Sequence, residues 1–457
     1  MQTLGLLHDP GRYGLATDLY QLTMAAGYFE NGMGLESATF ELFARRLPRN
    51  RGYLLAAGLE QAVEYLLGLR FDGASVEYLR ALPHFGAVSE GFWEYLREFR
   101  FTGDLNAVPE GTVAFPDEPL LQVRGPLIEA QMVETFLLAT LNHQTLVASK
   151  AARVVDAAAG KGVVEFGARR AHGFDAALYG ARAAVIAGCV GTSNVLAGQA
   201  FGLDVYGTAA HSFTMAFPRE RDSFRAFQRV FPQHCILLID TYDTLEGARR
   251  AVELGPGVRG VRLDSGDILT LSRQVRRILD EGGLTESIIV ASGDLNEDSI
   301  AVLTREGAPV DLYGVGTELI TSRDAPALSG VYKLVSVEED GLHRPVRKLS
   351  PEKSTYPDAK QLYRTRGADG RFAGDVLALA EEDLGDNTPG AEPLLQPVLR
   401  GGQLVAPLPP LAEIQSRARA QREALPDAIR RLQDPEPYPL ALSGGLAALV
   451  AEMQSGG

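Results

Sequence analysis

Length, composition and charge limit what this chain can be. Its 457 residues and 46% hydrophobic content correspond to roughly two or three domains of ~150 residues with sizeable cores. Asp plus Glu (58) outnumber Lys plus Arg (44), so the formal net charge is −14. This surplus argues against broad nucleic-acid or anionic-membrane binding, although it leaves room for a local cationic pocket.

The cysteines and the apolar runs favour a protein of the cytoplasm. Cys189 and Cys235 both lie in apolar surroundings, which favours buried thiols over a disulfide or a metal pair. The first residues, MQTLGLLHDPGRYG, contain no apolar core of signal-peptide length. No run reaches the ~18 apolar residues of a membrane span. We therefore expect a soluble, cytoplasmic protein with no membrane partner.

The first third of the chain mixes helical and strand-like patterns. Apolar residues recur at helical spacing in Leu15–Asn31, whereas Ser37–Phe43 alternates like a strand. The basic loop Arg45–Arg51 is either a solvated turn or a contact for a phosphorylated ligand. Short β-type runs between Pro and Gly in Phe101–Gly125 predict a small antiparallel β-domain. Further helices are expected at Leu54–Leu69, Val76–Arg80, Ser89–Phe99 and, as one or two helices, Leu127–Val155.

The middle of the chain places charged groups after two apolar runs. Val163–Phe166 and Leu203–Tyr206 read as buried strands, and the small-residue segment Phe174–Gly202 between them predicts helix, turn, helix. The basic pair Arg169 and Arg170 follows the first run, and His211 follows the second. Such groups at strand ends are typical of an α/β active site, so this stretch is where we expect the chemistry.

From His234 the pattern becomes regular. Strands CILLID, VRGVRLD, SIIVASGD and VDLYGVG alternate with the helical patterns Thr244–Glu253, Ile268–Asp280 and Glu297–Glu306. With the two earlier runs there are at least six strands in βα units, which indicates a parallel sheet. A closed or nearly closed barrel is favoured over an open sheet, and no GxGxxG turn supports a dinucleotide-binding fold. The tail has a strand at VYKLVSV, a polar segment Glu381–Pro397, and surface helices expected at Leu411–Leu432 and Leu440–Glu452.

Three acidic residues end successive strands of this pattern. Asp240, Asp264 and Asp294 would converge on one face of a parallel barrel. Asp is also a common helix cap, but the following helices have other candidate caps, namely Asp243 with Glu246, Asp267 and Asn296. We therefore predict that the three acids are functional, and carboxylates of this kind bind Mg²⁺, sugar hydroxyls or both.

An arginine and several glycines accompany these acids. Arg262 lies two residues before Asp264, so in a strand both point to the same face. The pair is either a salt bridge or a holder for an anionic ligand. Gly293, Gly314 and Gly316 allow backbone N–H groups to approach a ligand, and with a helix start following they favour a phosphate cradle.

His211 and Phe166 complete the candidate set. His211 lies among small residues, so it is either a structural histidine or an accessible acid, base or phosphoryl acceptor. Phe166 is either a core aromatic or a stacking face for a planar ring. Taken together, the residues favour a transferase or isomerase that acts on a phosphorylated sugar.

Eight motifs in order along the chain resemble the nicotinate phosphoribosyltransferase family. They are DLYQLTM (Asp18–Met24), EFGARRAHG (Glu165–Gly173), GTSNVLAG (Gly191–Gly198), GTAAHS (Gly207–Ser212), IDTYD (Ile239–Asp243), VRLDSGD (Val261–Asp267), SGDLNE (Ser292–Glu297) and YGVGTEL (Tyr313–Leu319). The resemblance runs from near residue 13 to about residue 365.

The resemblance implies a fold and a reaction. The fold would be an irregular α/β barrel of the type II phosphoribosyltransferase kind over residues 126–344, a discontinuous α+β domain over 1–125 and 345–400, and a helical tail over 401–457. Nicotinate and 5-phosphoribosyl 1-diphosphate would give nicotinate mononucleotide and diphosphate, the first step of NAD salvage from nicotinate. Mg²⁺ would be the cofactor, and ATP a co-substrate coupled through a phosphohistidine at His211. The family is usually homodimeric with shared active sites.

The same resemblance implies residue roles. Phe166 would stack on the pyridine ring, with Tyr20 of the partner subunit on its other face. Arg169 and Arg262 would hold substrate anions, and Asp264 and Asp294 the ribose. The remaining contacts would be Gly293, Gly316 and Thr317 to phosphate, Asp240 near Mg²⁺-diphosphate, and Lys348, with Lys353 and Lys360, to phosphates across the interface.

One position favours nicotinate over nicotinamide. Related nicotinamide enzymes place an acid in the motif that reads Gly191-Thr192-Ser193 here, and that acid would accept a hydrogen bond from the amide. Ser193 is neutral, so a ring carboxylate would not be repelled. The alternatives are a nicotinamide phosphoribosyltransferase, a quinolinate-specific relative, and a catalytically silent protein that binds a phosphosugar.

Overall fold

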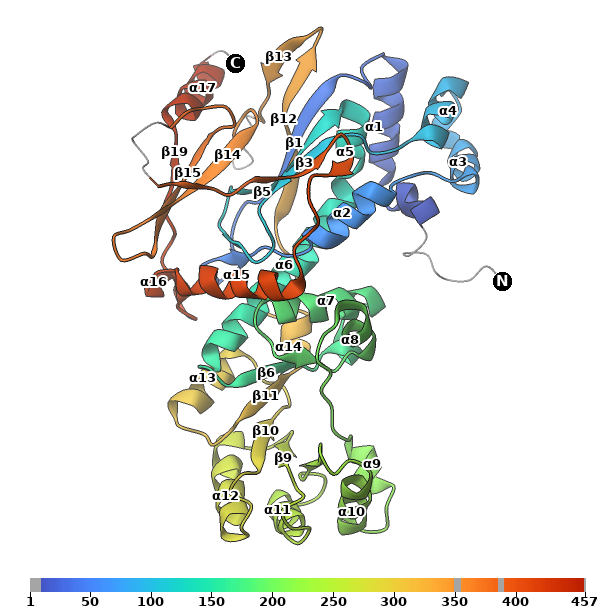
Figure 1. The fold of residues 1–457 in the computed structure, drawn as a ribbon. Coiled ribbons are helices and arrows are strands. Elements are labelled where there is room, and N and C mark those ends of the chain that lie inside the picture. The colour runs from blue at the N-terminus through green and yellow to red at the C-terminus, as the bar shows by residue number, and fades with distance from the viewer. Residues whose placement is uncertain (1–9, 349–354, 385–389, 456–457) are drawn as a thin grey trace. The chain divides into compact units, whose positions relative to one another are not determined.

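The computed structural model describes residues 10–348, 355–384 and 390–455 and divides into two compact units (Figure 1). Unit 1 comprises Met1–Thr145 and Ala327–Gly457, and unit 2 comprises Leu146–Pro326. The sequence predicts boundaries near residues 125 and 345 and a separate tail over 401–457. In the structure, residues 126–145, 327–344 and 401–457 all belong to unit 1, because strands in the last third of the chain pair with strands from the first. No described helix is both long and apolar enough to cross a bilayer.

Unit 2 is built on a six-stranded parallel sheet in the order β7-β6-β11-β10-β9-β8. Its strands are short apolar runs, as expected when helices cover both faces of a parallel sheet. They are β6 (Gly162–Glu165), β7 (Gly191–Thr192), β8 (Ile236–Leu238), β9 (Gly260–Leu263), β10 (Ile288–Ala291) and β11 (Leu312–Val315). The sequence predicted β6 and the alternation from β8 to β11.

Helices follow the strands of unit 2 in the order predicted. Asp243, Asp267 and Asn296 each accept a hydrogen bond from a first-turn backbone N–H, so the predicted caps of α11, α12 and α13 are confirmed. The helices of this unit are α7 (Phe174–Ile186), α8 (Val195–Phe201), α9 (His211–Met215), α10 (Glu220–Val230), α11 (Thr244–Val252), α12 (Ile268–Glu281), α13 (Glu297–Arg305) and α14 (Thr317–Ile320), with a 3-10 turn η3 (Ala168–Arg170).

One predicted strand of unit 2 is wrong. Leu203–Tyr206 forms only an isolated bridge from Val205 to Thr192, and its side chains at Val205 and Tyr206 are exposed. Gly202 ends α8 in the left-handed conformation immediately before it, so the apolar run is a connection and not a core strand. No ladder joins the edge strands β7 and β8 within the described residues, and closure into a barrel stays a prediction.

Unit 1 is built on a seven-stranded sheet in the order β13-β12-β1-β5-β3-β17-β18. The separate β-domain expected at Phe101–Gly125 is wrong, because β3 and β5 are inner strands of this larger sheet. Its strands are β1 (Ser37–Ala44), β3 (Asp104–Ala107), β5 (Pro119–Pro126), β12 (Gly330–Glu339), β13 (Leu342–Pro345), β17 (Gln396–Arg400) and β18 (Gln403–Leu404).

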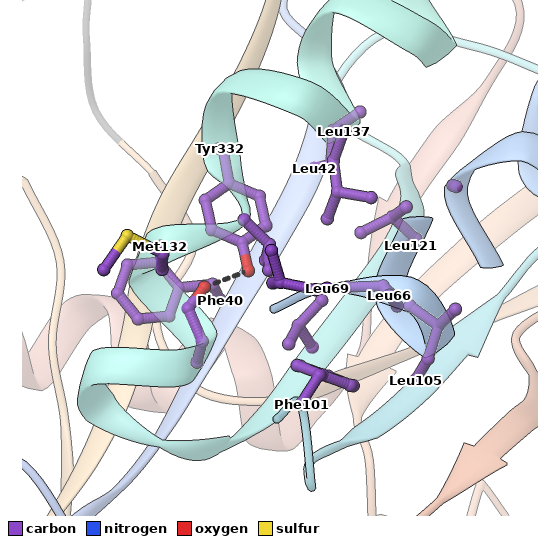
Figure 2. Close-up of a cluster of buried hydrophobic side chains, with 14 of the residues drawn as sticks. Phe40, Leu42, Leu66, Leu69, Phe101, Leu105, Leu121, Met132, Leu137 and Tyr332 are labelled. Carbon is purple, nitrogen blue, oxygen red and sulfur yellow. Dashed lines mark hydrogen bonds between the residues drawn. The ribbon is translucent and has the colours of Figure 1, made fainter. Parts of the chain in front are cut away.

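The core of unit 1 lies against this sheet (Figure 2). The rings of Phe40 on β1 and Tyr332 on β12 stack with centroids 5.1 Å apart. The Tyr332 hydroxyl donates to the Ala130 carbonyl at 2.6 Å, and a dashed line marks this bond at the hydroxyl in Figure 2. The ring is therefore buried with its one polar atom satisfied, as buried tyrosines require.

Smaller elements complete unit 1. A four-stranded sheet has the order β16-β14-β15-β19, and β2 pairs with β4. The helix expected from Leu54 begins only at Leu59, after β2, and the helix expected from Leu440 begins at Gly444, after β19. These strands are β2 (Leu54–Leu55), β4 (Val113–Ala114), β14 (Lys360–Arg366), β15 (Phe372–Leu379), β16 (Glu392–Pro393) and β19 (Leu440–Leu442).

The helices of the N-terminal part are η1 (Pro10–Leu15), α1 (Leu19–Glu30), α2 (Leu59–Gly68), α3 (Gly73–Arg80), η2 (Pro83–Phe85), α4 (Glu90–Glu98), α5 (Leu127–Met132) and α6 (Glu134–Ala157). Those of the C-terminal part are α15 (Leu411–Glu423), α16 (Asp427–Arg430) and α17 (Gly444–Ser455). The helix expected over Leu411–Leu432 is divided in two, because Pro426 cannot continue it.

Candidate active site

The predicted acids lie at one edge of the parallel sheet in unit 2. Strands β8, β9 and β10 run parallel and in register, so the residues that follow them reach the same edge. Asp240, Asp264 and Asp294 follow these strands. A direct bond joins the first two, since the Asp264 backbone N–H donates to Asp240 Oδ2 at 3.0 Å.

Arg262 connects four parts of this edge. Its Nε donates to Ser292 Oγ at 2.9 Å, and its Nη2 to Asp264 Oδ1 at 2.9 Å. Its Nη1 donates to Thr208 Oγ1 at 3.0 Å. The guanidinium carbon is 5.9 Å from the centroid of the Phe166 ring, within the range of a cation–π contact. The guanidinium therefore links a planar ring to hydroxyl and carboxylate groups.

Asp264 is held as a carboxylate. Burial alone raises its pKa, but hydrogen bonds from Ser292 and Arg262 outweigh burial, so the pKa lies below its ordinary value. Ser292 Oγ donates to Oδ1 at 2.5 Å. The other oxygen, Oδ2, lies 3.8 Å from His211 Nε2. An ionised acid that keeps one oxygen available is suited to a sugar hydroxyl.

His211 is accessible, as the sequence predicted. It is the first residue of α9, and its side chain is 40% exposed. Its Nδ1 lies 3.1 Å from Thr241 Oγ1, which orients the ring and turns Nε2 toward Asp264. His211, Asp264 and Arg262 thus form one cluster.

Asp240 has one carboxylate oxygen available to coordinate a metal ion. Its Oδ2 accepts from the Asp264 N–H and from Ser265 Oγ at 2.6 Å. Its Oδ1 is buried and has no hydrogen-bond partner among the described residues. Within the same residues no cluster of three or more metal-ligating side chains occurs. The donor set fits Mg²⁺ held by one carboxylate, with waters and substrate phosphates as its other ligands.

The Gly293–Asp294 turn approaches the backbone of the neighbouring strand. Gly293 has φ +86°, and a β-carbon built on it would overlap the Asp264 carbonyl oxygen. Asp294 has φ +39°, a region that non-glycine residues rarely adopt. The capped N-terminus of α13 follows two residues later. Close approach and a helix start are the features of a phosphate-binding turn.

Phe166 and Arg169 lie at the end of β6. The Phe166 ring lies against Gly314 of β11, where a β-carbon would overlap it. Arg169 is exposed on η3, so its guanidinium can meet an anion. Gly316 and Thr317, the other predicted phosphate contacts, follow β11 at the start of α14.

Of the remaining predicted residues, Ser193 lies in unit 2 beside the end of β6, and the other described ones lie in unit 1. Ser193 lies at the end of β7, where its N–H donates to the Glu165 carbonyl at 2.9 Å. Tyr20, 48% exposed on α1, and the exposed Lys348 belong to unit 1. Lys360 is buried and pairs with Glu41 at 2.8 Å, which argues against a direct phosphate contact. Lys353 lies outside the described residues.

Sequence reasoning missed the hydroxyl groups of this site. Thr208, Thr241 and Ser292 hold Arg262, His211 and Asp264. Each lies within a motif that the sequence does show, directly beside or near a predicted residue. Hydroxyls adjacent to candidate charged groups were therefore the available signal.

Comparisons with known proteins identify the family. Family models for nicotinate phosphoribosyltransferase match the chain in three parts: the N-terminal domain at residues 15–142, the family's main model at 162–355 and the C-terminal domain at 386–450. The nicotinate phosphoribosyltransferase pncB2 of Mycobacterium tuberculosis is 45% identical and covers 96% of this chain and 94% of its own. That of Bacillus subtilis is 41% identical over 94% of this chain and 92% of its own.

Solved structures agree with this assignment. The crystal structure of human nicotinic acid phosphoribosyltransferase superposes with a TM-score of 0.85 at 34% identity, covering 96% of this chain and 99% of that one. A nicotinate-nucleotide pyrophosphorylase from Pyrococcus furiosus superposes with a TM-score of 0.75 at 26% identity, covering 93% and 98%. The chain belongs to the nicotinate phosphoribosyltransferase family, and its α/β fold is that of these structures.

Proposed function

We propose that this protein transfers the phosphoribosyl group of 5-phosphoribosyl 1-diphosphate to nicotinate, giving nicotinate mononucleotide and diphosphate as the first step of NAD salvage from nicotinate. The observation that carries the proposal is the position of Arg262. Its guanidinium lies over the Phe166 ring and bonds Asp264 and Ser292. One cation thus adjoins a face for the planar substrate and the groups for the sugar. The activity named for the relatives supports the same reaction.

The geometry suits a dissociative transfer. The pyridine nitrogen is already a nucleophile, so the reaction needs no general base. The site's task is to align the ring with C1 of the ribose and to stabilise charge as diphosphate departs. Asp264 and Asp294 would hold the ribose hydroxyls, and Gly293, Gly316 and Thr317 would offer N–H groups to phosphate oxygens. Arg169 would meet the ring carboxylate.

Mg²⁺ is the cofactor that we assign to Asp240. The unpartnered Oδ1 would be its protein ligand. When bound, the ion neutralises charge on the departing diphosphate. Removal of divalent ions with a chelator is expected to abolish transfer, and added Mg²⁺ to restore it.

We assign ATP as a co-substrate that phosphorylates His211. The His211 side chain is 40% exposed and its Nδ1 contacts Thr241, which leaves Nε2 as the nitrogen for the phosphoryl group and supports this role. A phosphoryl group there would add negative charge beside Asp264. His211→Ala is expected to keep slow basal transfer but lose ATP stimulation. A variant that still responds fully to ATP would contradict the phosphohistidine.

The choice of nicotinate depends on Ser193. A neutral side chain there would not repel a ring carboxylate, and the exposed Arg169 would bind one, so both residues favour nicotinate over the amide. Ser193→Asp is expected to shift preference toward nicotinamide, measured as the ratio of kcat/KM for the two rings. An unchanged ratio would overturn the selectivity argument.

We further propose that the protein is a cytoplasmic homodimer with shared active sites. The sheet of unit 2 would form an incomplete barrel. Tyr20, Leu19 and Met24 present exposed apolar surface along α1, which a second subunit would cover. Light scattering of the purified protein tests the assembly. A monomer would contradict the proposal that Tyr20 contacts the pyridine ring bound by a second subunit.

The deciding experiment offers nicotinate and nicotinamide in parallel with 5-phosphoribosyl 1-diphosphate and Mg²⁺, with and without ATP. Mononucleotide from nicotinate, increased by ATP, is the expected result. Product from nicotinamide alone would keep the mechanism and change the substrate. No product from either ring would support the silent phosphosugar-binding protein instead.

A further inference from the structure

Glu165 is a buried acid with no role in the mechanism above. It ends β6, directly before Phe166, and is 0% exposed. Among the described residues no cation pairs with it. Burial raises its pKa, and hydrogen bonds from Thr192 and Gly167 only partly offset this. Burying a carboxylate without a paired cation destabilises the folded state, so the contacts of Glu165 need an explanation.

Those contacts join the two segments that border the predicted ring site. The Gly167 N–H and the Thr192 hydroxyl (2.6 Å) both donate to the Glu165 carboxylate. The Thr192 hydroxyl oxygen in turn accepts from the Asn194 N–H at 3.0 Å. We call this set of Glu165, Gly167, Thr192 and Asn194 the Glu165 bridge.

The bridge fixes the residues on either side of Ser193 and the residue after Phe166. Thr192 is fully buried and Asn194 nearly so, and Asn194 also caps α8 by accepting from the Ala197 N–H. Backbone pairing already joins β6 to β7, because the Ser193 N–H donates to the Glu165 carbonyl. The buried carboxylate is therefore not needed to attach the strands. What it adds is a fixed geometry for Gly167 and for the Thr192–Asn194 turn.

We infer that Glu165 and Thr192 are positioning residues that set affinity and selectivity for the pyridine carboxylate by holding Ser193 at a fixed place relative to Phe166. This inference rests on the proposed function. Neither side chain needs to touch substrate, since both are buried beneath the segments that would. Asp240, Asp264 and Asp294, the proposed contacts to diphosphate and ribose, follow β8, β9 and β10, none of which pairs with β6 or β7. Gly316 lies beside Gly167, but the backbone ladder of β6 and β11 holds it there, so phosphate binding does not need the Thr192 hydroxyl.

Thr192→Val is the sharpest test, because valine keeps the branched shape and removes only the hydroxyl. We expect KM for nicotinate to rise by about three- to tenfold, the effect of one lost hydrogen bond, with KM for 5-phosphoribosyl 1-diphosphate unchanged. The preference for nicotinate over nicotinamide should fall as well. Thr192→Ser keeps the hydroxyl and should restore both values.

A matched control removes a threonine hydroxyl elsewhere in unit 2. Thr304 donates to the Ala157 carbonyl at 3.0 Å, away from the predicted site, and Thr304→Val should leave both KM values unchanged. Glu165→Gln, which keeps the shape of the acid, should resemble Thr192→Val in its KM values. In both bridge variants the Gly167 amide should exchange hydrogen faster, which is measurable without any turnover.

The outcomes separate the inference from the function on which it rests. If the wild type transfers phosphoribosyl to nicotinate but Thr192→Val keeps its KM, the inference is wrong and the function stands. A parallel rise of both KM values would mean general loosening and would also overturn it. A wild type with no transfer to either ring would refute the proposed function and this inference together.

Discussion

Two arginine–aspartate pairs, one in each unit, show how the same chemistry can serve two purposes. Arg364 and Asp375 on β14 and β15 of unit 1 lie 2.6 Å apart with both side chains 0% exposed. Arg262 and Asp264 on and after β9 of unit 2 lie 2.9 Å apart with 13% and 27% exposure. Distance hardly distinguishes the pairs. Their surroundings do.

The unit 1 pair has no capacity left for a ligand. Arg364 donates to Asp375, to the Val113 carbonyl and to Gln421, and its guanidinium lies 4.7 Å from the Phe372 ring centroid. In unit 2, Asp264 Oδ2 faces the accessible His211 and the neighbouring Asp240 keeps an unpartnered oxygen. Satisfied charges maintain structure, whereas partly satisfied ones at a strand edge are available for chemistry.

The largest effect is expected on removing the buried cation. Arg364→Met would leave the buried Asp375 carboxylate without its cation, and breaking such a pair costs about 3–5 kcal/mol of stability. The measurement is urea unfolding followed by circular dichroism. A loss of less than about 1 kcal/mol would mean that the buried pair contributes no more to stability than an exposed salt bridge does.

The corresponding change in unit 2 should act on activity. Arg262→Met removes a cation aimed at the substrate, and we expect kcat/KM to fall by about 10²-fold or more. Its stability loss should be smaller than that of Arg364→Met, because the Arg262 and Asp264 side chains are partly exposed. If the two variants lose the same stability, the distinction between the pairs is wrong.

A third effect concerns pH and the unit 1 cluster. Burial and the nearby Asp375 charge raise the pKa of Glu118 well above 4.5. The proton is bound more tightly in the folded state, so this contribution to stability is complete below 4.5 and is lost as pH rises through the raised pKa. Glu118→Gln should remove that decline. Unfolding midpoints of both proteins from about pH 5 to about pH 8 provide the test, and parallel curves would contradict it.

The smallest effect is the opposite pH response of Asp264. Its pKa is lowered from 3.8, so its contribution is present above that value and is lost as pH falls through the folded-state pKa. Asp264→Asn should therefore lose less stability than the wild type between about pH 5 and about pH 3. Exposed Asp267, whose lowered pKa comes from its cap bonds, gives a control in Asp267→Ala, which should remove the cap of α12 but leave transfer unchanged.

Local patterns predicted the βα units well, because each strand, cap and helix is encoded within about two dozen residues. The caps Asp243, Asp267 and Asn296 are examples. Patterns failed where the partner is distant: β3 and β5 read as a separate domain, since β17 lies almost 300 residues further along the chain and leaves no local trace.

The candidate site divides in the same way. Asp264 and Arg262 were predicted from a strand end, and His211 from an apolar run that the structure shows to be a connection. The structure nevertheless brings the three together. The hydroxyls of Thr208, Thr241 and Ser292 were not predicted, because only the fold shows which donors reach which charges. Glu165 was part of a recognised motif, but its burial and its bond to Thr192 follow from the pairing of β6 with β7, which no local pattern could indicate.

The contact between Gly293 and the Asp264 carbonyl has a consequence for how the site keeps its dimensions. Two strand ends rest against each other through backbone atoms alone, with no rotatable side chain between them. The spacing between Asp264 and Asp294 is thus set by the hard-core repulsion of a peptide unit, which barely yields to temperature or to neighbouring mutations. The separation of the two acids that we propose to hold the ribose is therefore fixed by the backbone itself.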